Sequence, residues 1–397
     1  MTGDEAALVR SLVAREREHM TRLRRHLHQH PELAYQERET AARVEHELRS
    51  VGFTPTRPTE TSIVCRVPTG RPGPVLVLRA DMDALPVRED TGHSFASRND
   101  GVMHACGHDG HMAVLVGVAR AVRTLAGRLA GEVRLLFQHA EEPLPSGAPE
   151  LIGKGVLDGA DAIVGLHLWS SLPLGRVCAS AGPLMASTDY FDITITGRGG
   201  HAGLPHDTVD PIAAGAHTVT NLRQIVARES NPADALVVAV TGFHGGEHNA
   251  VVPETARLYG TVRALDERVR RTTADRITRI ARSVAATHRA EAEVAYTFGS
   301  PAVVNDPTVA AVGQRVTRQH LGDDALVEMD PIMAGEDFAW YQERIPGLFL
   351  LVGAGRPDHP HHHPRFDFDE DALGVGMTLL LGIVLARCGG SPHRPHR

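Results

Sequence analysis

Lysine is almost absent from this 397-residue sequence: Lys154 is the only one, and arginine supplies nearly all of the positive charge. No long run of basic residues occurs, and the formal net charge is −7. Nucleic acids and anionic membranes bind basic surfaces. We therefore expect neither nucleic acid nor membrane as a partner.

Long apolar runs, a secretory leader and paired cysteines are also missing. No stretch of eighteen apolar residues appears, so no transmembrane helix is expected. The first residues, Met-Thr-Gly-Asp-Glu, lack the basic and apolar regions of a signal peptide. The four cysteines (Cys65, Cys106, Cys178 and Cys388) are too scattered for a disulfide framework. Together these absences predict a cytoplasmic protein.

The apolar residues that are present fall into short segments. Hydrophobic residues make up 42% and charged residues 22%, which is typical of a soluble globular protein. Two helices are expected within 4–51, interrupted at Pro31, and a third at 111–125. Strands buried on both faces of a sheet are expected at 75–78, 133–137, 162–166 and 348–352. The chain is too long for one ordinary core, so two domains are expected.

The pattern changes between 184 and 299. Strands and helices are expected there in the order β-α-β-β-α-β, which is the order of a ferredoxin-like unit. We therefore predict an α/β fold in which 1–183 and 300–397 form one discontinuous domain around a mixed, mainly parallel sheet. The ferredoxin-like α+β domain at 184–299 is inserted into it. The Pro/His/Arg-rich tail, 391–397, is expected to be disordered.

Ligand-type side chains concentrate between Met103 and His111. Three histidines, one cysteine and one aspartate fall within this stretch, and two glycines give the backbone room to turn. The Cys-x-His spacing lets Cys106 and His108 face one ion, and thiolate and imidazole suit zinc-like and manganese-like ions. The alternative, a loop of solvated histidines, leaves similar residues farther along the chain unexplained.

Further potential ligands follow each of the expected strands. They are Asp81 and Asp83, then Glu141 and Glu142, then His167, and finally His361-His362-His363. The carboxyl ends of parallel strands meet at one edge of a sheet, where open α/β folds bind ligands. Of two adjacent glutamates, one can bind a metal while its neighbour acts as a general base. The pattern predicts a metal-dependent hydrolytic site at this edge.

Several longer stretches carry a resemblance to a known family. They are Arg79-Ala80-Asp81-Met82-Asp83-Ala84-Leu85-Pro86, His104-Ala105-Cys106-Gly107-His108-Asp109-Gly110-His111, Ala140-Glu141-Glu142, Gly165-Leu166-His167, Gly199-Gly200-His201-Ala202, Asn249-Ala250-Val251-Val252-Pro253, Gly260-Thr261-Val262-Arg263 and His362-His363-Pro364-Arg365-Phe366-Asp367. In this order they resemble the M20 peptidase family of dinuclear metallohydrolases. The resemblance is to its amidohydrolase branch, which includes hippurate hydrolases, N-acyl-amino-acid amidohydrolases and auxin-conjugate hydrolases.

The resemblance implies two divalent ions per chain, of manganese, zinc, cobalt or nickel. The residues that match the family's ligands are Cys106, His108, Glu142, His167 and His362. Glu141 matches the general base, and Asp83 matches an acid that supports the site. His362 is chosen among three histidines because it lies two residues before Pro364. Its neighbours His361 and His363 are expected to tolerate substitution better.

The inserted domain is implied to act as a lid and as the dimerisation domain. His201 matches a histidine that reaches the active site of the partner subunit of a homodimer and stabilises the oxyanion. Asn249 and Arg263 stand where relatives contact the substrate carboxylate. His139 departs from the pattern, because proline is usual before Ala-Glu-Glu, and it adds a titratable group near the base.

The expected activity is hydrolysis of the amide bond of a small N-acyl-amino acid, with an acetyl, benzoyl or aryl-acetyl group. One alternative is a metal-dependent exopeptidase or dipeptidase. Another makes Cys106 a nucleophile with His108 as its base, although residues two apart rarely meet in that geometry. A third is a non-catalytic binding protein stabilised by metal, which leaves Glu141 unexplained.

Overall fold

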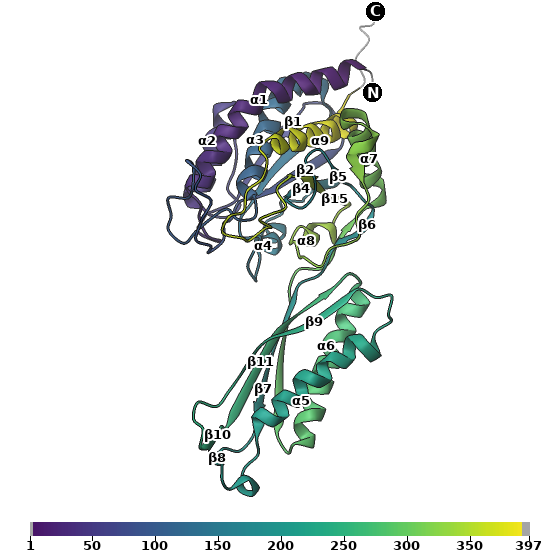
Figure 1. The fold of residues 1–397 in the computed structure, drawn as a ribbon. Helices are drawn as coiled ribbons and strands as arrows, with labels where there is room; N and C mark the ends of the chain where they lie inside the picture. The colour runs from purple at the N-terminus through teal and green to yellow at the C-terminus, as the bar shows by residue number, and fades with distance from the viewer. Residues whose placement is uncertain (1–2, 391–397) are drawn as a thin grey trace, which may run out of the picture. The chain divides into compact units, whose positions relative to one another are not determined.

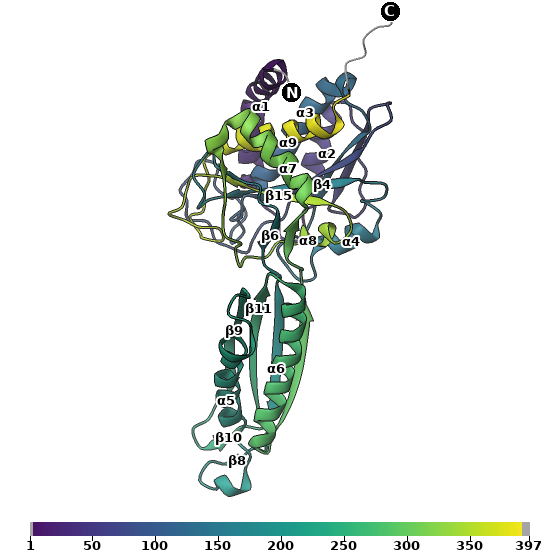
Figure 2. The same ribbon diagram turned by 90° about the vertical axis from the view of Figure 1, so that its right-hand side faces the viewer.

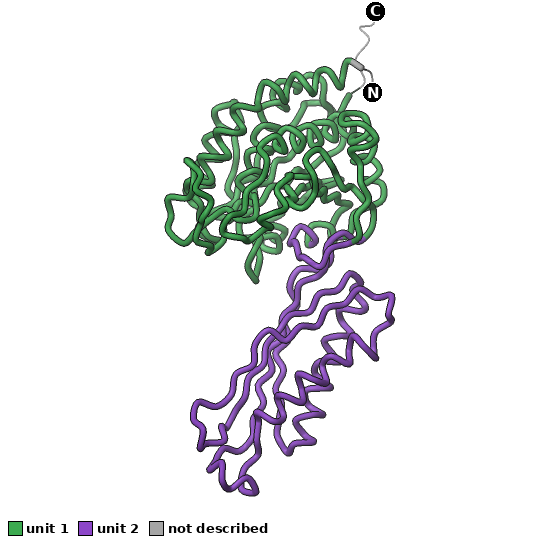
Figure 3. The backbone as a smooth tube through the Cα atoms, viewed as in Figure 1, with its two compact units in different colours: residues 1–182, 304–330, 340–397 green, residues 183–303, 331–339 purple. Residues whose placement is uncertain are grey.

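The chain folds into two compact units, and the computed structural model describes residues 3–390. The tail at 391–397, for which the sequence predicts disorder, lies outside the described residues. Figure 3 shows unit 1 in green and unit 2 in purple. Unit 1 consists of Met1–Gly182, Val304–Asp330 and Trp340–Arg397, and unit 2 of Pro183–Val303 and Pro331–Ala339.

The bounds of the elements follow the chain from end to end. The helices are α1 Gly3–Gln29, α2 Arg38–Ser50, α3 His108–Leu125, α4 Gly147–Gly153, α5 Pro211–Gln224, α6 Glu267–Thr287, α7 Pro307–Leu321, α8 Ala339–Gln342 and α9 Asp371–Cys388. The strands are β1 Ile63–Pro68, β2 Val75–Asp81, β3 Glu132–Gln138, β4 Ala162–Trp169, β5 Val177–Cys178, β6 Gly182–Met185, β7 Asp189–Thr196, β8 Gly200–His201, β9 Leu236–Gly245, β10 Val251–Val252, β11 Thr255–Ala264, β12 Glu291–Phe298, β13 Val303–Asn305, β14 Leu326–Val327 and β15 Gly347–Gly353.

Unit 1 is built on a sheet with the strand order β1-β3-β2-β4-β15-β5-β14. The central pairs β3–β2, β2–β4 and β4–β15 are parallel, whereas β1 runs antiparallel to β3 and β5 runs antiparallel to β15. Helices α3 and α9 pack on β2 and β4, and α1 packs on α3 and α9 (Figure 1). The predicted α/β fold with a mixed, mainly parallel sheet is confirmed.

Helix α9 is apolar all round because it lies in the core of unit 1. Its length and its hydropathy of 1.7 would allow it to cross a membrane, but 67% of it is buried within the protein. A helix that is apolar on every side is expected either in a core or in a membrane. The burial of α9 fits a core helix.

Two element boundaries differ from those expected, and both affect the site. Helix α3 begins at His108 instead of residue 111, and Gly107, which has a φ of +88°, is its N-cap residue directly after Cys106. Strand β4 continues to Trp169, so His167 lies inside the strand and not after it. Its pairing with β15, which extends to Trp169, keeps the backbone extended through His167.

Unit 2 has a four-stranded antiparallel sheet with the order β12-β7-β11-β9. Helices α5 and α6 pack against each other and cover one face of this sheet (Figure 2). The chain order β7-α5-β9-β11-α6-β12 with this strand order is the ferredoxin-like arrangement predicted from the sequence. Alternating apolar residues of β7 and β11, such as Ile193 and Leu258, form its core with Ile277 of α6.

Candidate metal centre

The parallel strands of unit 1 bring ligand-type side chains to one edge of the sheet. Asp81 is the last residue of β2, and Asp83 follows it. Glu141 and Glu142 follow the end of β3, while His167 lies near the end of β4. Because β3, β2 and β4 are parallel neighbours, these segments meet at their carboxyl ends.

Of the groups of ligand atoms at this edge, three consist of predicted metal ligands and Glu141, each with its atoms within 4.8 Å of one another. They are Cys106, His108 and His167; Cys106, Glu142 and His362; and His108, Glu141 and Glu142. Cys106, His108 and Glu142 each belong to two of these groups. The structure therefore brings together all five residues that match metal ligands, together with Glu141.

The two buried histidines present nitrogen atoms that are suited to a metal. His108 Nδ1 donates to the backbone carbonyl of Asp83 at 2.9 Å, and its buried Nε2 has no hydrogen-bond partner among the described residues. His167 Nδ1 donates to the carbonyl of Leu168 at 3.0 Å, which leaves Nε2 3.4 Å from Cys106 Sγ. Metal-binding histidines commonly donate their other nitrogen in this way. The donor set fits divalent ions.

The electrostatics of the site favour a cation as well. Burial lowers the pKa of His108, but the charges of Asp81 and Asp83 outweigh it and raise this pKa to about 10. Burial, with the charges of Glu142 and Glu141, raises the pKa of the Cys106 thiol well above its ordinary value. A metal needs a neutral imidazole and a thiolate, so binding would release protons from both residues.

The backbone of the glutamate pair is held by two other carboxylates. Asp83 accepts the N–H of Glu141 through Oδ1 at 3.0 Å and the N–H of Glu142 through Oδ2 at 3.1 Å. Ala140, just before the pair, has a φ of +49° and donates its N–H to Glu37 Oε1 at 2.8 Å. Asp83 therefore supports the pair by fixing its backbone. Glu37 has the same kind of role, and the sequence offered no signal for it.

The loop after β15 contributes His362. Its φ is +68°, its backbone N–H donates to Ala105, and Nε2 lies 3.2 Å from Glu142 Oε1. Its neighbour His361 stacks on Trp169 at 4.5 Å and donates from Nε2 to the carbonyl of Leu168 at 3.0 Å. These contacts argue against the expected tolerance of His361 to substitution.

Comparison with known proteins agrees with this geometry. Residues 77–386 match the model of peptidase family M20/M25/M40. The chain belongs to the M20 peptidase family. It is 44% identical to the N-acyl-L-amino acid amidohydrolase of Geobacillus stearothermophilus over 80% of this chain and 87% of that protein. It is 38% identical to the N-acetylcysteine deacetylase of Bacillus subtilis over 91% of this chain and 95% of that protein.

Solved structures extend the comparison to the fold and the metals. The Bacillus subtilis YXEP protein, described as a dinuclear metal-binding peptidase from the M20 family, is 34% identical to this chain. Its TM-score is 0.83, and the match covers 94% of this chain and 98% of that one. This M20 chain is thus a hydrolase of a family with dinuclear metal centres, and its own ligand groups fit such a centre.

A buried charge cluster lies behind the ligands of this M20 hydrolase. Arg24 of α1 donates to Asp109, next to His108, at 2.9 Å. It also donates to Asp367 at 3.0 Å and to Glu370 at 3.1 Å, in the segment that follows His362. Arg24 thereby ties together the two segments that supply these histidines. The helical pattern of α1 does not distinguish a buried arginine from an exposed one, so the sequence does not reveal this role.

His139, which stands where proline is usual, contacts α4. His139 Nε2 lies 3.2 Å from Glu150, and its ring packs edge-on against Tyr35 at 5.2 Å. Burial lowers the pKa of His139. The added histidine therefore stays neutral near neutral pH, in contact with Glu150.

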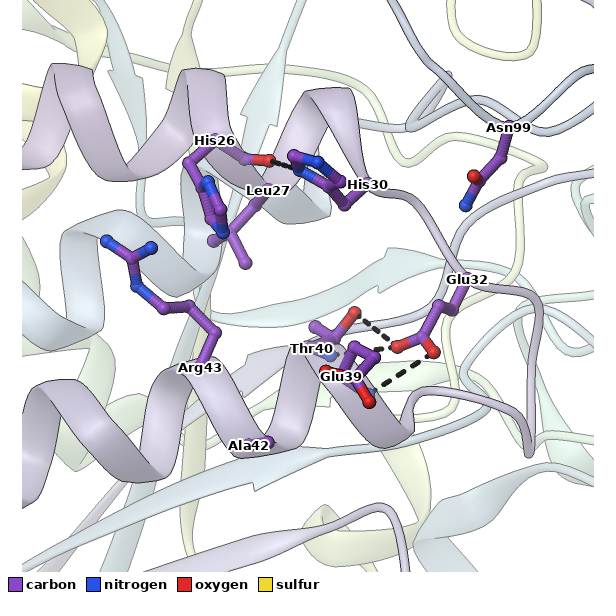
Figure 4. A pocket seen from close by; sticks show the side chains of 9 residues that line it. All are labelled: His26, Leu27, His30, Glu32, Glu39, Thr40, Ala42, Arg43 and Asn99. Atoms are coloured by element: carbon purple, nitrogen blue, oxygen red, sulfur yellow. Dashed lines mark hydrogen bonds between the residues drawn. The ribbon is translucent and has the colours of Figure 1, made fainter.

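A separate pocket of about 440 Å³ lies between α1 and α2 (Figure 4). His26 and His30 both line it, and His30 Nδ1 donates to the carbonyl of His26 at 2.8 Å. Glu32 accepts the N–H groups of Glu39 and Thr40 and so caps the start of α2. None of the predicted site residues lines this pocket.

The three candidate residues of unit 2 are not gathered at one place. His201 forms β8 and pairs with Val251 of β10, and Asn249 lies just before β10, so these two share one end of the unit. Arg263 lies near the other end of β11 and donates to Thr188. Arg263 lies eight positions after Thr255, the first residue of β11, which in an extended strand corresponds to roughly 25 Å.

Proposed function

We propose that this protein is a metal-dependent amidohydrolase that cleaves N-acyl-amino acids into a carboxylic acid and a free amino acid. The observation that carries the proposal is the overlap of three ligand groups around Cys106, His108 and Glu142, with Glu141 beside them. Relatives named for N-acyl-L-amino acid and N-acetylcysteine hydrolysis support the substrate class. Acetyl, benzoyl and aryl-acetyl groups are the acyl groups proposed.

We propose that five side chains bind two divalent ions. They are Cys106, His108, Glu142, His167 and His362, and manganese, zinc, cobalt and nickel all suit this donor set. When bound, such ions lower the pKa of a water molecule toward neutrality and polarise the amide carbonyl. The orphaned Nε2 of His108 and the orientation of His167 support these assignments.

The chain's own residues then handle the proton. Glu141 takes a proton from the attacking water and delivers it to the leaving nitrogen. Asp83 accepts the backbone N–H groups of Glu141 and Glu142, which fixes the backbone that orients the base and the ligand. His201 stabilises the developing negative charge on the carbonyl oxygen.

We propose that the enzyme is a cytoplasmic homodimer joined through the inserted domain at 184–299, with 1–183 and 300–397 as the catalytic domain. Asn249 and Arg263 are both assigned to the substrate carboxylate, yet Asn249 lies just before β10, ahead of the start of β11, and Arg263 lies near the other end of β11. One small carboxylate cannot meet both residues of a single chain across roughly 25 Å. A dimer in which each subunit supplies one of them removes this conflict.

The general base is tested by two glutamine variants. Glu141→Gln keeps the shape and removes the base, so metal content should persist while turnover falls by about 10²–10⁴. Glu142→Gln should weaken metal binding instead. Turnover of acetyl-, benzoyl- and indole-acetyl-amino acids and metal content by elemental analysis are measured for both. Reversed phenotypes would show that the two roles are exchanged.

The dimer is tested by mixing two inactive chains. If His201 acts in the partner's site, a hybrid of Glu141→Gln and His201→Ala chains contains one site with both residues intact. Activity should then return once the subunits exchange, with light scattering to verify dimers. Proven exchange without recovery would show that His201 does not act across the dimer.

A metal-dependent exopeptidase or dipeptidase is the second candidate, because the YXEP protein is described as a peptidase. The two activities differ in what lies beyond the scissile bond, since a peptide substrate brings a free α-amino group. Rates for an acetylated amino acid and for the dipeptide with the same leaving amino acid discriminate between them. A clear preference for the dipeptide would favour the peptidase.

A further inference from the structure

Strand β4 changes its partners beside the candidate metal centre. β15 pairs with β4 as far as Trp169, whereas β2, on the other side, pairs with it only as far as Gly165. Buried N–H and C=O groups need partners, so Leu168 depends on side chains here. His111 Nε2 accepts the Leu168 N–H at 2.9 Å, and His361 Nε2 donates to the Leu168 carbonyl at 3.0 Å.

His111 is held in a single tautomer by its hydrogen bond to Asp81, which is itself paired with Arg79. Because Nε2 accepts from the backbone, Nδ1 carries the proton and donates to Asp81 Oδ1 at 2.6 Å. The other oxygen of Asp81 accepts from the Arg79 guanidinium at 2.6 Å, and Arg79 also donates to Gln138 at 2.8 Å. Both nitrogens of His111 are therefore occupied. His111 is not available as a metal ligand, although it lies close to Asp81 and His108.

The Leu168 carbonyl also orients a candidate ligand, His167. His167 Nδ1 donates to the same oxygen at 3.0 Å, and this bond leaves Nε2 3.4 Å from Cys106 Sγ. If the Leu168 peptide plane rotated, the His167 ring would lose the acceptor that sets both its orientation and its tautomer.

We propose that Arg79, Asp81 and His111 form a positioning chain that fixes the Leu168 peptide and, through it, points Nε2 of His167 at the metal site. His361 supports the same carbonyl from the opposite side. The inference rests on the proposed role of His167 as a metal ligand. It assigns a role to two residues of the recognised motifs, Asp81 and His111, that are not themselves ligands.

Amide hydrogen exchange of the metal-free protein tests the first step. In His111→Phe the Leu168 amide should exchange faster, whereas β4 residues paired with β15, such as Val164, should stay protected. In His111→Gln the side-chain oxygen can still accept this N–H, so protection should largely return. Unchanged exchange of the Leu168 amide in His111→Phe would overturn the proposal.

Binding of Co²⁺, measured by competition with a chromophoric chelator, tests the second step. His111→Phe should bind about 10–100-fold more weakly than the unmodified protein, as expected when the support of a ligand is lost. His111→Gln should bind more tightly than His111→Phe. Leu125→Ala is the matched control, because it removes a buried side chain at the far end of the same helix, α3. It should destabilise the fold and leave Co²⁺ affinity unchanged.

The outcomes separate this inference from the proposed function. If the unmodified protein binds no Co²⁺, both fail. If it binds Co²⁺ and His111→Phe binds equally well, or Leu125→Ala loses as much affinity, only the positioning chain is refuted. Should His111→Phe not fold, Asp81→Asn preserves the volume and removes the charge that holds His111. Faster Leu168 exchange with weaker Co²⁺ binding is then expected, and unchanged values for both overturn the proposal.

Discussion

Replacing Glu37 by glutamine should change how the stability of unit 1 depends on pH. Glu37 is fully buried at the start of α2, where Oε1 accepts the N–H of Ala140 and Oε2 has no partner among the described residues. Burial, with the charge of Asp83 as a further contribution, raises its pKa from 4.5 to about 7. Glutamine retains the acceptor for Ala140 and cannot ionise.

The sign and size of the effect follow from this raised pKa. Between pH 4.5 and 7 the folded state keeps a proton on Glu37 that the unfolded state has lost, so stability falls as pH rises through this window. A difference of 2.5 pKa units, from 4.5 to about 7, corresponds to about 3 kcal/mol. The stability that the folded protein gains by keeping Glu37 protonated is fully present below pH 4.5 and fully lost above pH 7. Relative to the unmodified protein, Glu37→Gln should therefore gain up to about 3 kcal/mol across the window.

Tryptophan fluorescence during urea unfolding of the metal-free protein measures this change. Both tryptophans, Trp169 and Trp340, lie in unit 1, so the signal reports on the unit that contains Glu37. Glu39→Gln, on the exposed first turn of α2, is the control that removes the same charge without a buried environment. Curves of stability against pH that run parallel for the unmodified protein and Glu37→Gln would refute the reasoning.

Three further predictions concern the metals. Cys106→Ala should lose at least one of two bound ions by elemental analysis, whereas Cys178→Ala, at another buried cysteine, should keep both. Asp83→Asn turns one acceptor of the glutamate N–H groups into a donor, so metal affinity or turnover should fall about 10–100-fold; unchanged values in titration and kinetics would contradict this role. Chelation should abolish turnover while circular dichroism stays native, because the core of unit 1 is hydrophobic. Unfolding on chelation would instead indicate a structural metal.

Much of the fold could be predicted because its central elements have strong local patterns. Strands β2, β3, β4 and β15 are rich in apolar residues, since both of their faces are buried. The elements that escaped prediction lack such contrast. Strand β1 is a short antiparallel edge strand that contains an exposed arginine and ends in a proline. Helix α9 is apolar on every side, so no helical stripe marks it.

The candidate ligands could be predicted because each is a residue type that metals prefer, placed near a strand end. Supporting residues cannot be recognised in that way, because their roles depend on contacts between distant segments. Glu37 meets Ala140 across 103 positions, and His361 meets Leu168 across 193. Asp81 and His111 lie within recognised motifs, yet only the hydrogen bonds show that they position other groups instead of binding metal themselves.

The candidate ligand His362 and Ala140, the residue before the glutamate pair, have backbone conformations that are unfavourable for residues with a Cβ atom. Ala140 and His362 both have positive φ, a conformation that costs roughly 1–2 kcal/mol for a residue with a Cβ. Such strain persists only where the surroundings determine the backbone. Here the N–H of Ala140 is held by Glu37 and that of His362 by the carbonyl of Ala105. The direction of Glu141, Glu142 and His362 therefore depends on hydrogen bonds that none of these three side chains makes, which is why residues outside the ligand set control the geometry of the site.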